Sequence, residues 1–100
     1  MRESEAVAVI QDLSKRKEER IQAAFSLEKA SEESLRVLCN VLTTEPSPVV
    51  RHEFAFVLGE TGRSDLVAES LMKSVEEDEN VFVRHEAILA LATLGDKKFR

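Results

Sequence analysis

The chain repeats a motif of about 33 residues, and this repeat limits the possible folds more than any other feature of the sequence. Residues 47–62 read SPVVRHEFAFVLGETG and residues 80–95 read NVFVRHEAILALATLG, so identical Val-Arg-His-Glu strings recur 33 residues apart. A fainter copy, EERIQAAFSLEKA at residues 18–30, has Ile21-Gln22 where the later copies have His-Glu. Self-similarity at such a period is typical of helical solenoids, whose neighbouring repeats bury one another's apolar faces.

Signals for helix starts and stops divide each repeat into two helices. Ser31 precedes two glutamates, Ser47 precedes a proline, and Asn80 occupies the equivalent position one repeat later. All three are residue types that cap helix N-termini, and proline favours the first helical position. Gly62 and Gly95 each follow an apolar periodic stretch, where a C-terminal cap requires positive φ. We therefore expect short helices joined by tight turns.

The apolar spacing predicts six helices in three antiparallel hairpins. The expected pairs are 4–13 with 17–29, 32–43 with 48–60, and 65–76 (opened by Ser64-Asp65) with 81–94. The second-helix strings, with a Val-Arg opening, small central residues and a closing Leu and Gly, resemble HEAT-like repeats. We predict an all-α fold, an α-solenoid of three helical hairpins. It forms a single domain over residues 1–100, with repeats at about 4–30, 31–62 and 64–95.

Composition and charge exclude several classes of function. The net charge of −5 argues against binding to nucleic acid, and the basic run Lys15-Arg16-Lys17 is followed at once by two glutamates, as in a solvated helix start. No apolar stretch approaches the roughly 18 residues of a membrane span, and the N-terminus lacks the apolar core of a signal peptide. The single cysteine, Cys39, lies in an apolar helical pattern and is expected to be buried rather than nucleophilic. A cytoplasmic location is the expectation.

The chemically distinctive residues are the two His-Glu pairs. In an ordinary repeat of this kind, the two positions after Val-Arg carry a variable residue and then a small one. Glu53 and Glu86 occupy the small-residue position, where the next helix should partly bury them. A partly buried carboxylate costs free energy unless a cation pairs with it. That cation could be a metal ion, or it could be the neighbouring Arg51 or Arg84.

Stacking of the repeats would bring the two pairs together. Equivalent positions on packed helices lie about 8–10 Å apart, so His52 and His85 could reach one ion while a carboxylate supplies a third ligand. Two histidines and one carboxylate form the donor set of non-haem Fe(II) sites, although zinc and manganese also accept these ligands. The candidate metal ligands are therefore His52, Glu53, His85 and Glu86, and the sequence identifies no catalytic residue.

The strings VVRHEFAFVLGETG and VFVRHEAILALATLGD, preceded by a repeat without the pair, resemble the amino-terminal half of deoxyhypusine hydroxylase. This resemblance implies a di-iron centre that uses O₂ to hydroxylate a modified lysine on a translation factor. It implies that His52, Glu53, His85 and Glu86 are iron ligands or lie beside them. That family carries four His-Glu pairs in two halves, and this chain carries two. The resemblance therefore implies a homodimer or a longer parent chain that supplies the others.

A second interpretation needs no metal. The concave face of the solenoid would dock a protein partner, and the His-Glu pairs would only line it. One form of this interpretation is a small companion to a bilin-lyase-type repeat protein, a family that shares the general repeat pattern. Both interpretations expect a protein as partner or substrate, and neither expects nucleic acid or a membrane.

Overall fold

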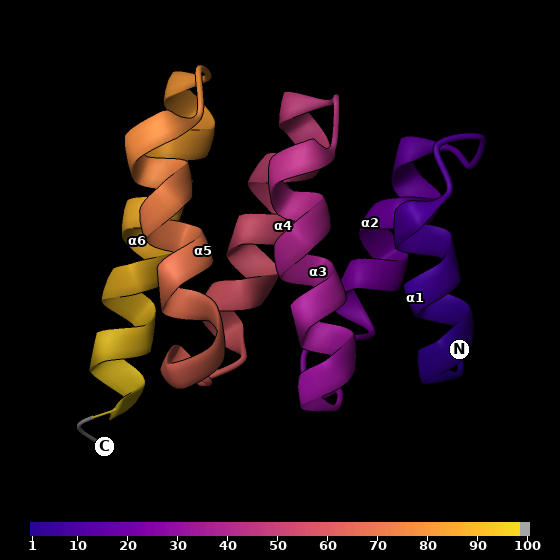
Figure 1. The fold of residues 1–100 in the computed structure, drawn as a ribbon, viewed down its shortest axis with the longest axis horizontal. Helices are drawn as coiled ribbons and strands as arrows, with labels where there is room; N and C mark the ends of the chain where they lie inside the picture. Colours follow the sequence, from indigo (N-terminus) through magenta and orange to yellow (C-terminus); the bar gives the residue numbers. More distant parts are fainter. Residues whose placement is uncertain (99–100) are drawn as a thin grey trace.

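The computed structural model describes residues 1–98 of the chain. It contains six α-helices: α1 (Glu3–Gln11), α2 (Lys17–Phe25), α3 (Glu32–Thr44), α4 (Pro48–Glu60), α5 (Ser64–Glu77) and α6 (Val81–Lys98). No strand occurs in the described part of the chain. The helices form three consecutive antiparallel hairpins (Figure 1), which confirms the predicted all-α solenoid.

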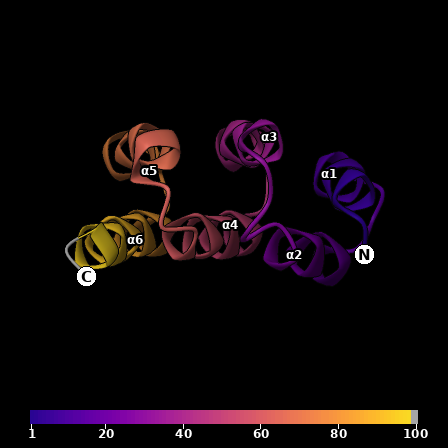
Figure 2. The ribbon, with the colours of Figure 1, turned by 90° about the horizontal axis from the view of Figure 1, so that it is seen from below.

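The hairpins stack side by side to form two layers. Helices α2, α4 and α6 lie in one row, which we call the inner layer (Figure 2). Helices α1, α3 and α5 lie in the other row, the outer layer, and are spaced more widely. Each repeat thus contributes its first helix to the outer layer and its second helix to the inner layer, where both His-Glu pairs are found.

The predicted N-caps form as expected. The side chain of Ser31 accepts a hydrogen bond from the Ser34 amide at the start of α3. Ser47 caps α4 in the same way by accepting from the Val50 amide, with Pro48 as the first helical residue. At α6, Asn80 Oδ1 accepts from the two amides that follow it by two and three residues. These side chains fix where three of the helices begin.

Several helix ends differ from the prediction. Gly62 has a φ of +71° and ends the turn after α4 as expected, but Gly95 lies inside α6, so its predicted capping role is wrong. Helix α6 continues because Leu94, one turn beyond Ala90, is buried against the core. Helix α2 ends at Phe25, four residues before the predicted position. Beyond it, the amides of Leu27 and Glu28 donate to carbonyl oxygens three residues earlier, which is the hydrogen-bond pattern of a tighter, 3₁₀-type turn. Ser64 is the first residue of α5 rather than its N-cap, and Arg63 takes that position without a side-chain bond.

The core runs through all three repeats between the two layers. Its largest fully buried side chains are Ile10, Leu27, Leu35, Leu38, Leu42, Val50, Phe54, Val57, Leu58, Val67, Leu71 and Val83. Cys39 is buried beside them, as predicted. Because Val50 and Val83 lie at equivalent positions and are both fully buried, they set the rotation of α4 and α6 about their axes. The His-Glu pairs that follow them are placed at the same height on neighbouring helices.

Buried ion pairs connect successive repeats. Arg20 of α2 pairs with Glu45, which follows α3, and both side chains are almost completely buried. One repeat later, Arg51 of α4 pairs with Asp78, which follows α5, with Nε to Oδ2 at 2.8 Å and Nη2 to Oδ1 at 3.2 Å. The Arg51 and Asp78 side chains are only 10% and 8% exposed. These pairs, called here the arginine ladder, fix the register of each repeat on the next.

Helices α4 and α6 approach very closely because a glycine lies between them. A Cβ atom placed on Gly59 would lie only 2.7 Å from Cβ and 2.8 Å from Cα of Ala90. No larger residue fits there without movement of one helix. This close contact, between the last turn of α4 and the middle of α6, holds together the two helices that carry the His-Glu pairs.

Candidate metal centre

The two His-Glu pairs lie near the start of neighbouring inner-layer helices. His52 and Glu53 are in α4, and His85 and Glu86 are in α6. Burial differs among them: the side chain of Glu86 is 12% exposed, those of Glu53 and His52 are 33% and 36% exposed, and His85 is an exposed residue. The predicted shielding of the glutamates is therefore strong for Glu86 and weaker for Glu53.

His52 lies between two carboxylates. Its Nε2 atom is 3.2 Å from Oε1 of Glu86 on the neighbouring helix, and its Nδ1 atom is 3.5 Å from Oε1 of Glu53. The nearer contact joins the histidine of one repeat to the glutamate of the next. The stacking therefore brings together three of the four residues predicted from the sequence, with His52 at the centre.

The environment of Glu86 makes a nearby cation favourable. Burial raises the pKa of Glu86, the charge of His52 acts in the opposite direction, and the carboxylates of Glu53 and Glu60 raise it further. His85 also lies close enough to lower this pKa by its charge. A buried carboxylate surrounded by other acids is stabilised by any cation that can reach it.

The two arginines that could have paired with the glutamates have other partners. Arg51 is bound to Asp78, and Arg84 Nη1 donates to the carbonyl oxygen of Asp78 at 2.8 Å. The alternative in which Arg51 or Arg84 neutralises the repeated glutamates is therefore wrong. In the described residues, the only basic side chain within 4 Å of a glutamate of these pairs is His52.

The donor types and the main contact fit a divalent metal ion. Two ligands that each lie about 2.1 Å from one ion at a right angle are about 3.0 Å apart, close to the 3.2 Å between His52 Nε2 and Glu86 Oε1. Imidazole and carboxylate together suit iron, zinc and manganese. However, among residues 1–98 no group of three or more His, Cys, Asp or Glu side chains is arranged to hold an ion. The chain presents a partial ligand set.

A groove opens beside this ligand set, between α4 and α6. It has a volume of about 470 Å³ and includes Glu86, the apolar side chains of Phe56 and Leu89, and the acids Glu60 and Asp96. The sequence interpretation did not include Glu60 in the site. A signal was present, because Glu60 follows Glu53 by seven residues and two helical turns place such residues on one face. The groove thus joins an apolar wall to an acidic rim.

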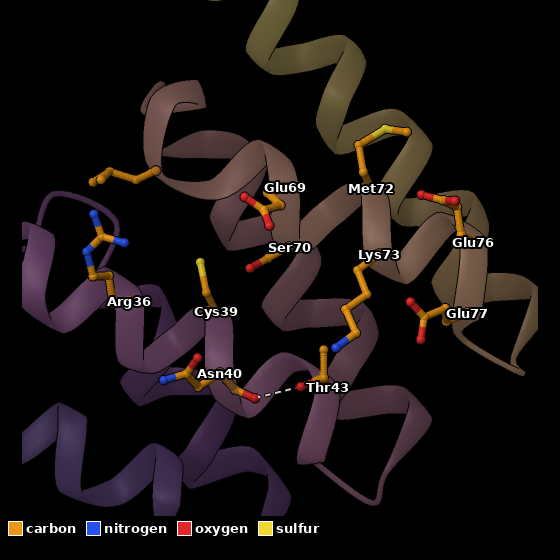
Figure 3. Close-up of a pocket in the computed structure, with 11 residues that line it drawn as sticks. Arg36, Cys39, Asn40, Thr43, Glu69, Ser70, Met72, Lys73, Glu76 and Glu77 are labelled. Atoms are coloured by element: carbon orange, nitrogen blue, oxygen red, sulfur yellow. Dashed lines mark hydrogen bonds between the residues drawn. The ribbon is translucent and has the colours of Figure 1, made fainter.

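A separate pocket lies in the outer layer, between α3 and α5, away from the His-Glu pairs. It has a volume of about 700 Å³, and Figure 3 shows Arg36, Cys39, Ser70 and Lys73 around it. Burial raises the pKa of the Cys39 thiol, so the thiolate form is disfavoured. This agrees with the predicted structural role of Cys39, and none of the predicted site residues lines this pocket.

Comparison with known protein families agrees with the repeat architecture. The family model described as HEAT repeats matches residues 35–99, which include both His-Glu pairs. The chain belongs to the HEAT repeat family. No helix among residues 1–98 of this HEAT repeat protein is both long and apolar enough to cross a membrane.

Curated relatives of this HEAT repeat protein share one name. Deoxyhypusine hydroxylase of Saccharomyces cerevisiae is 30% identical over 88 residues, which are 78% of this chain and 27% of that protein. The enzyme of the same name from Candida albicans is 45% identical over 56 residues, 54% of this chain and 17% of the relative. The predicted likeness to this family is confirmed, and the chain spans only about a quarter or less of each relative. No solved structure matches the chain.

Proposed function

We propose that this chain is a metal-binding HEAT repeat unit related to deoxyhypusine hydroxylase, and that it holds iron through its His-Glu pairs. The observation that carries the proposal is the contact of 3.2 Å between His52 Nε2 and Glu86 Oε1 across two repeats. Relatives named deoxyhypusine hydroxylase support iron as the metal. Iron held by histidine and carboxylate ligands can activate O₂, so the function that follows is that of an O₂-dependent monooxygenase.

Each residue of the pairs would have a distinct task. His52 and Glu86 would be the central ligands, because they already approach each other within a metal's reach. Glu53 lies 3.5 Å from the other nitrogen of His52, where it would accept a hydrogen bond from that nitrogen and orient the ring. His85, which is exposed, would complete the set.

We further propose that the complete centre needs more His-Glu pairs than this chain contains. The described residues provide a partial ligand set, and the chain covers 27% of the relative from Saccharomyces cerevisiae. A second copy that faces the inner layer, or the rest of a longer parent chain, would bring two further pairs. The groove beside Glu86, with acids on its rim and apolar side chains on its wall, would receive a side chain of a protein substrate.

A cytoplasmic location is part of the same proposal. Cys39 is the single cysteine of the chain, and it is a free, buried thiol. Thiols persist in reducing compartments, where Fe(II) is also retained. Fractionation of the source cells, followed by immunodetection of the chain, tests the location directly.

The test of the proposal is elemental analysis of the purified chain and of two variants. The double variant His52→Ile with Glu53→Gln copies the Ile21-Gln22 pair that the first repeat carries at this position. It should lose iron while it keeps the helical fold, because the first repeat folds with those residues. The equivalent double variant, His85→Ile with Glu86→Gln, should also lose iron and keep the helical fold.

A control variant, Glu33→Gln, removes one exposed carboxylate from α3 and should leave the iron content unchanged. A visible absorption band after exposure of the iron-loaded chain to O₂ would support a two-iron centre. A chain that stays monomeric and binds no iron under anaerobic loading contradicts the proposal. If the variants and the wild type have the same metal content and melting temperature, the scaffold interpretation is the correct one.

A further inference from the structure

At the α6 end of the solenoid, the last arginine of the arginine ladder has no acidic partner within residues 1–98. Arg20, Arg51 and Arg84 are each the fourth residue of their inner-layer helix. Nη1 of Arg84 donates to the Asp78 carbonyl at 2.8 Å, as Nη1 of Arg51 donates to the Glu45 carbonyl at 2.9 Å. Arg20 and Arg51 also pair with a carboxylate from the following repeat, whereas Arg84 makes no ion pair within residues 1–98. Its guanidinium is positioned for the acid of a further repeat.

The opposite end of the solenoid carries an acid without an arginine. Asp12, Glu45 and Asp78 are each the C-cap residue of an outer-layer helix, with extended backbone. Each carboxylate accepts a hydrogen bond from the amide two residues later, and for Asp12 the donor is Ser14 at 3.0 Å. Glu45 and Asp78 also receive an arginine from the preceding repeat. Asp12 makes no ion pair in the described part of the chain.

From these two ends, we propose that a second copy of this chain docks head to tail on α6, so that its Asp12 pairs with Arg84 of the first copy. The contact would continue the arginine ladder from one molecule into the next. Arg84 and Asp12 already make the same local hydrogen bonds that orient the equivalent arginine and acid of the pairs inside the chain. Such preorganisation reduces the conformational entropy lost on docking.

The inner-layer residues at the two ends fit the same arrangement. Within the chain, Phe25 stacks on Phe56 with ring centroids 5.9 Å apart, and Phe56 and Leu89 line one groove. Leu89, 46% exposed at the end of this row, would therefore meet Phe25 of the second copy. Ile88 is 51% exposed, whereas Ala55, its equivalent one repeat earlier, is completely buried. Docking would thus cover apolar surface that α6 now exposes.

Polar and small residues also continue across the proposed contact. The contact of His52 with Glu86 becomes a contact of His85 with Gln22 of the second copy, because these are the equivalent positions one repeat later. An uncharged amide can serve as hydrogen-bond partner to an imidazole in either tautomer. Within the chain, the small residue Gly59 packs against Ala90. The equivalent positions across the proposed contact are Ala92 and Ser26 of the second copy, which are also small. No bulky residue obstructs the close approach of the helices.

This head-to-tail contact does not require metal, although it includes His85, which the proposed metal centre also uses. It uses the two ends of the solenoid, and it includes Leu89 and Ala92, which also line the groove between α4 and α6. The contact is heterologous, since different surfaces of the two copies meet, so it can extend into chains of molecules or close into a ring. Its test is therefore carried out with metal removed by a chelator, which separates it from any association through the His-Glu pairs.

Sedimentation velocity over a wide range of concentration tests the proposal. The wild-type chain should show a mean mass that rises with concentration above the 11.2 kDa of one copy. Arg84→Glu and Asp12→Arg place like charges at the contact, and each should weaken association by on the order of tenfold or more. An equimolar mixture of the two variants should associate again, because each then meets an opposite charge. Asp12→Asn, which keeps the acceptor for the Ser14 amide, should also weaken association.

The matched control is Arg36→Glu, a charge reversal at an exposed site on α3 whose pair with Glu32 is local. It should leave the mass distribution unchanged. Thermal melting of each variant by circular dichroism confirms that the fold is retained. A wild-type chain that stays at the mass of one copy at every concentration overturns the proposal. Association that neither Arg84→Glu nor Asp12→Arg alters also overturns it.

Discussion

His52 Nε2 lies 3.2 Å from Glu86 Oε1, and this contact links the His-Glu pair of one repeat to that of the next. It exists because equivalent helix positions stack and because Gly59 lets α4 and α6 approach closely. Glu86 is mostly buried there, and the arginines nearest in sequence are bound to other groups. The site is therefore a product of the repeat register rather than of either pair alone.

Replacement of Gly59 by alanine should destabilise the chain and separate the two pairs. The new Cβ would lie 2.8 Å from the backbone Cα of Ala90, so one helix must move. We expect a loss of about 1–3 kcal/mol in the free energy of unfolding, as for other overpacked contacts. Urea denaturation measures this loss.

Gly95→Ala provides the matched control for that substitution. Gly95 lies within α6, and nothing lies within 4 Å of a Cβ placed on it. Alanine should therefore increase stability by up to about 1 kcal/mol through its greater helix propensity. Equal effects of the two substitutions would show that the close packing of α4 on α6 is absent.

Removal of one partner of the Arg51–Asp78 pair should be strongly destabilising. Both side chains are buried, and Arg51 also donates to the carbonyl oxygens of Glu45 and Pro46. Asp78→Asn would leave a buried guanidinium without its counter-charge, and we expect a cost of about 3–5 kcal/mol. Chemical denaturation of Asp78→Asn, Arg51→Met and the double variant measures the coupling energy, and additive effects would contradict it.

The pH dependence of stability should change when Glu86 is replaced by glutamine. Folding raises the pKa of Glu86, mainly by burial, so the folded chain holds this proton more tightly than the unfolded chain. The resulting stability is present below the ordinary value of 4.5 and is lost as the pH rises through the folded pKa. As the pH rises from 4.5 through the folded pKa of Glu86, the free energy of unfolding should therefore fall more for the wild type than for Glu86→Gln, with a chelator present in both samples.

Urea denaturation at a series of pH values measures this difference, with Glu33→Gln as the control for loss of one exposed carboxylate. The surrounding groups that also act on Glu86 are His52, His85, Glu53 and Glu60. Parallel curves for the wild type and Glu86→Gln would contradict the burial of a destabilised carboxylate.

Sequence periodicity predicted the architecture well because each repeat carries its own local signals. The Ser31, Ser47 and Asn80 caps and the recurring apolar spacing determine helices through contacts within a few residues. The end of α6 was mispredicted because Gly95 resembles Gly62 in the sequence, while burial of Leu94 keeps the helix intact. A local glycine signal could not reveal that tertiary contact.

The candidate site was predicted in its residues but not in its contacts. Identical Val-Arg-His-Glu strings identified both pairs, and repeat stacking predicted that His52 and His85 converge, whereas the contact observed between the repeats joins His52 to Glu86. The partner of Arg51 lies 27 residues away in the sequence, at Asp78, and no periodic pattern pointed to it. Without that partner, the arginine could be mistaken for the counter-charge of the glutamates.

Anaerobic equilibrium dialysis against Fe(II) tests the central claim most directly. The metal-free wild type should bind iron saturably, and the His52→Ile/Glu53→Gln variant and Glu86→Gln should each lose most of that affinity. Bound iron should also stabilise the fold, by about 2.7 kcal/mol at a free concentration one hundred times Kd. Iron binding by both variants with the affinity of the wild type, or no saturable binding by the wild type, would contradict the account.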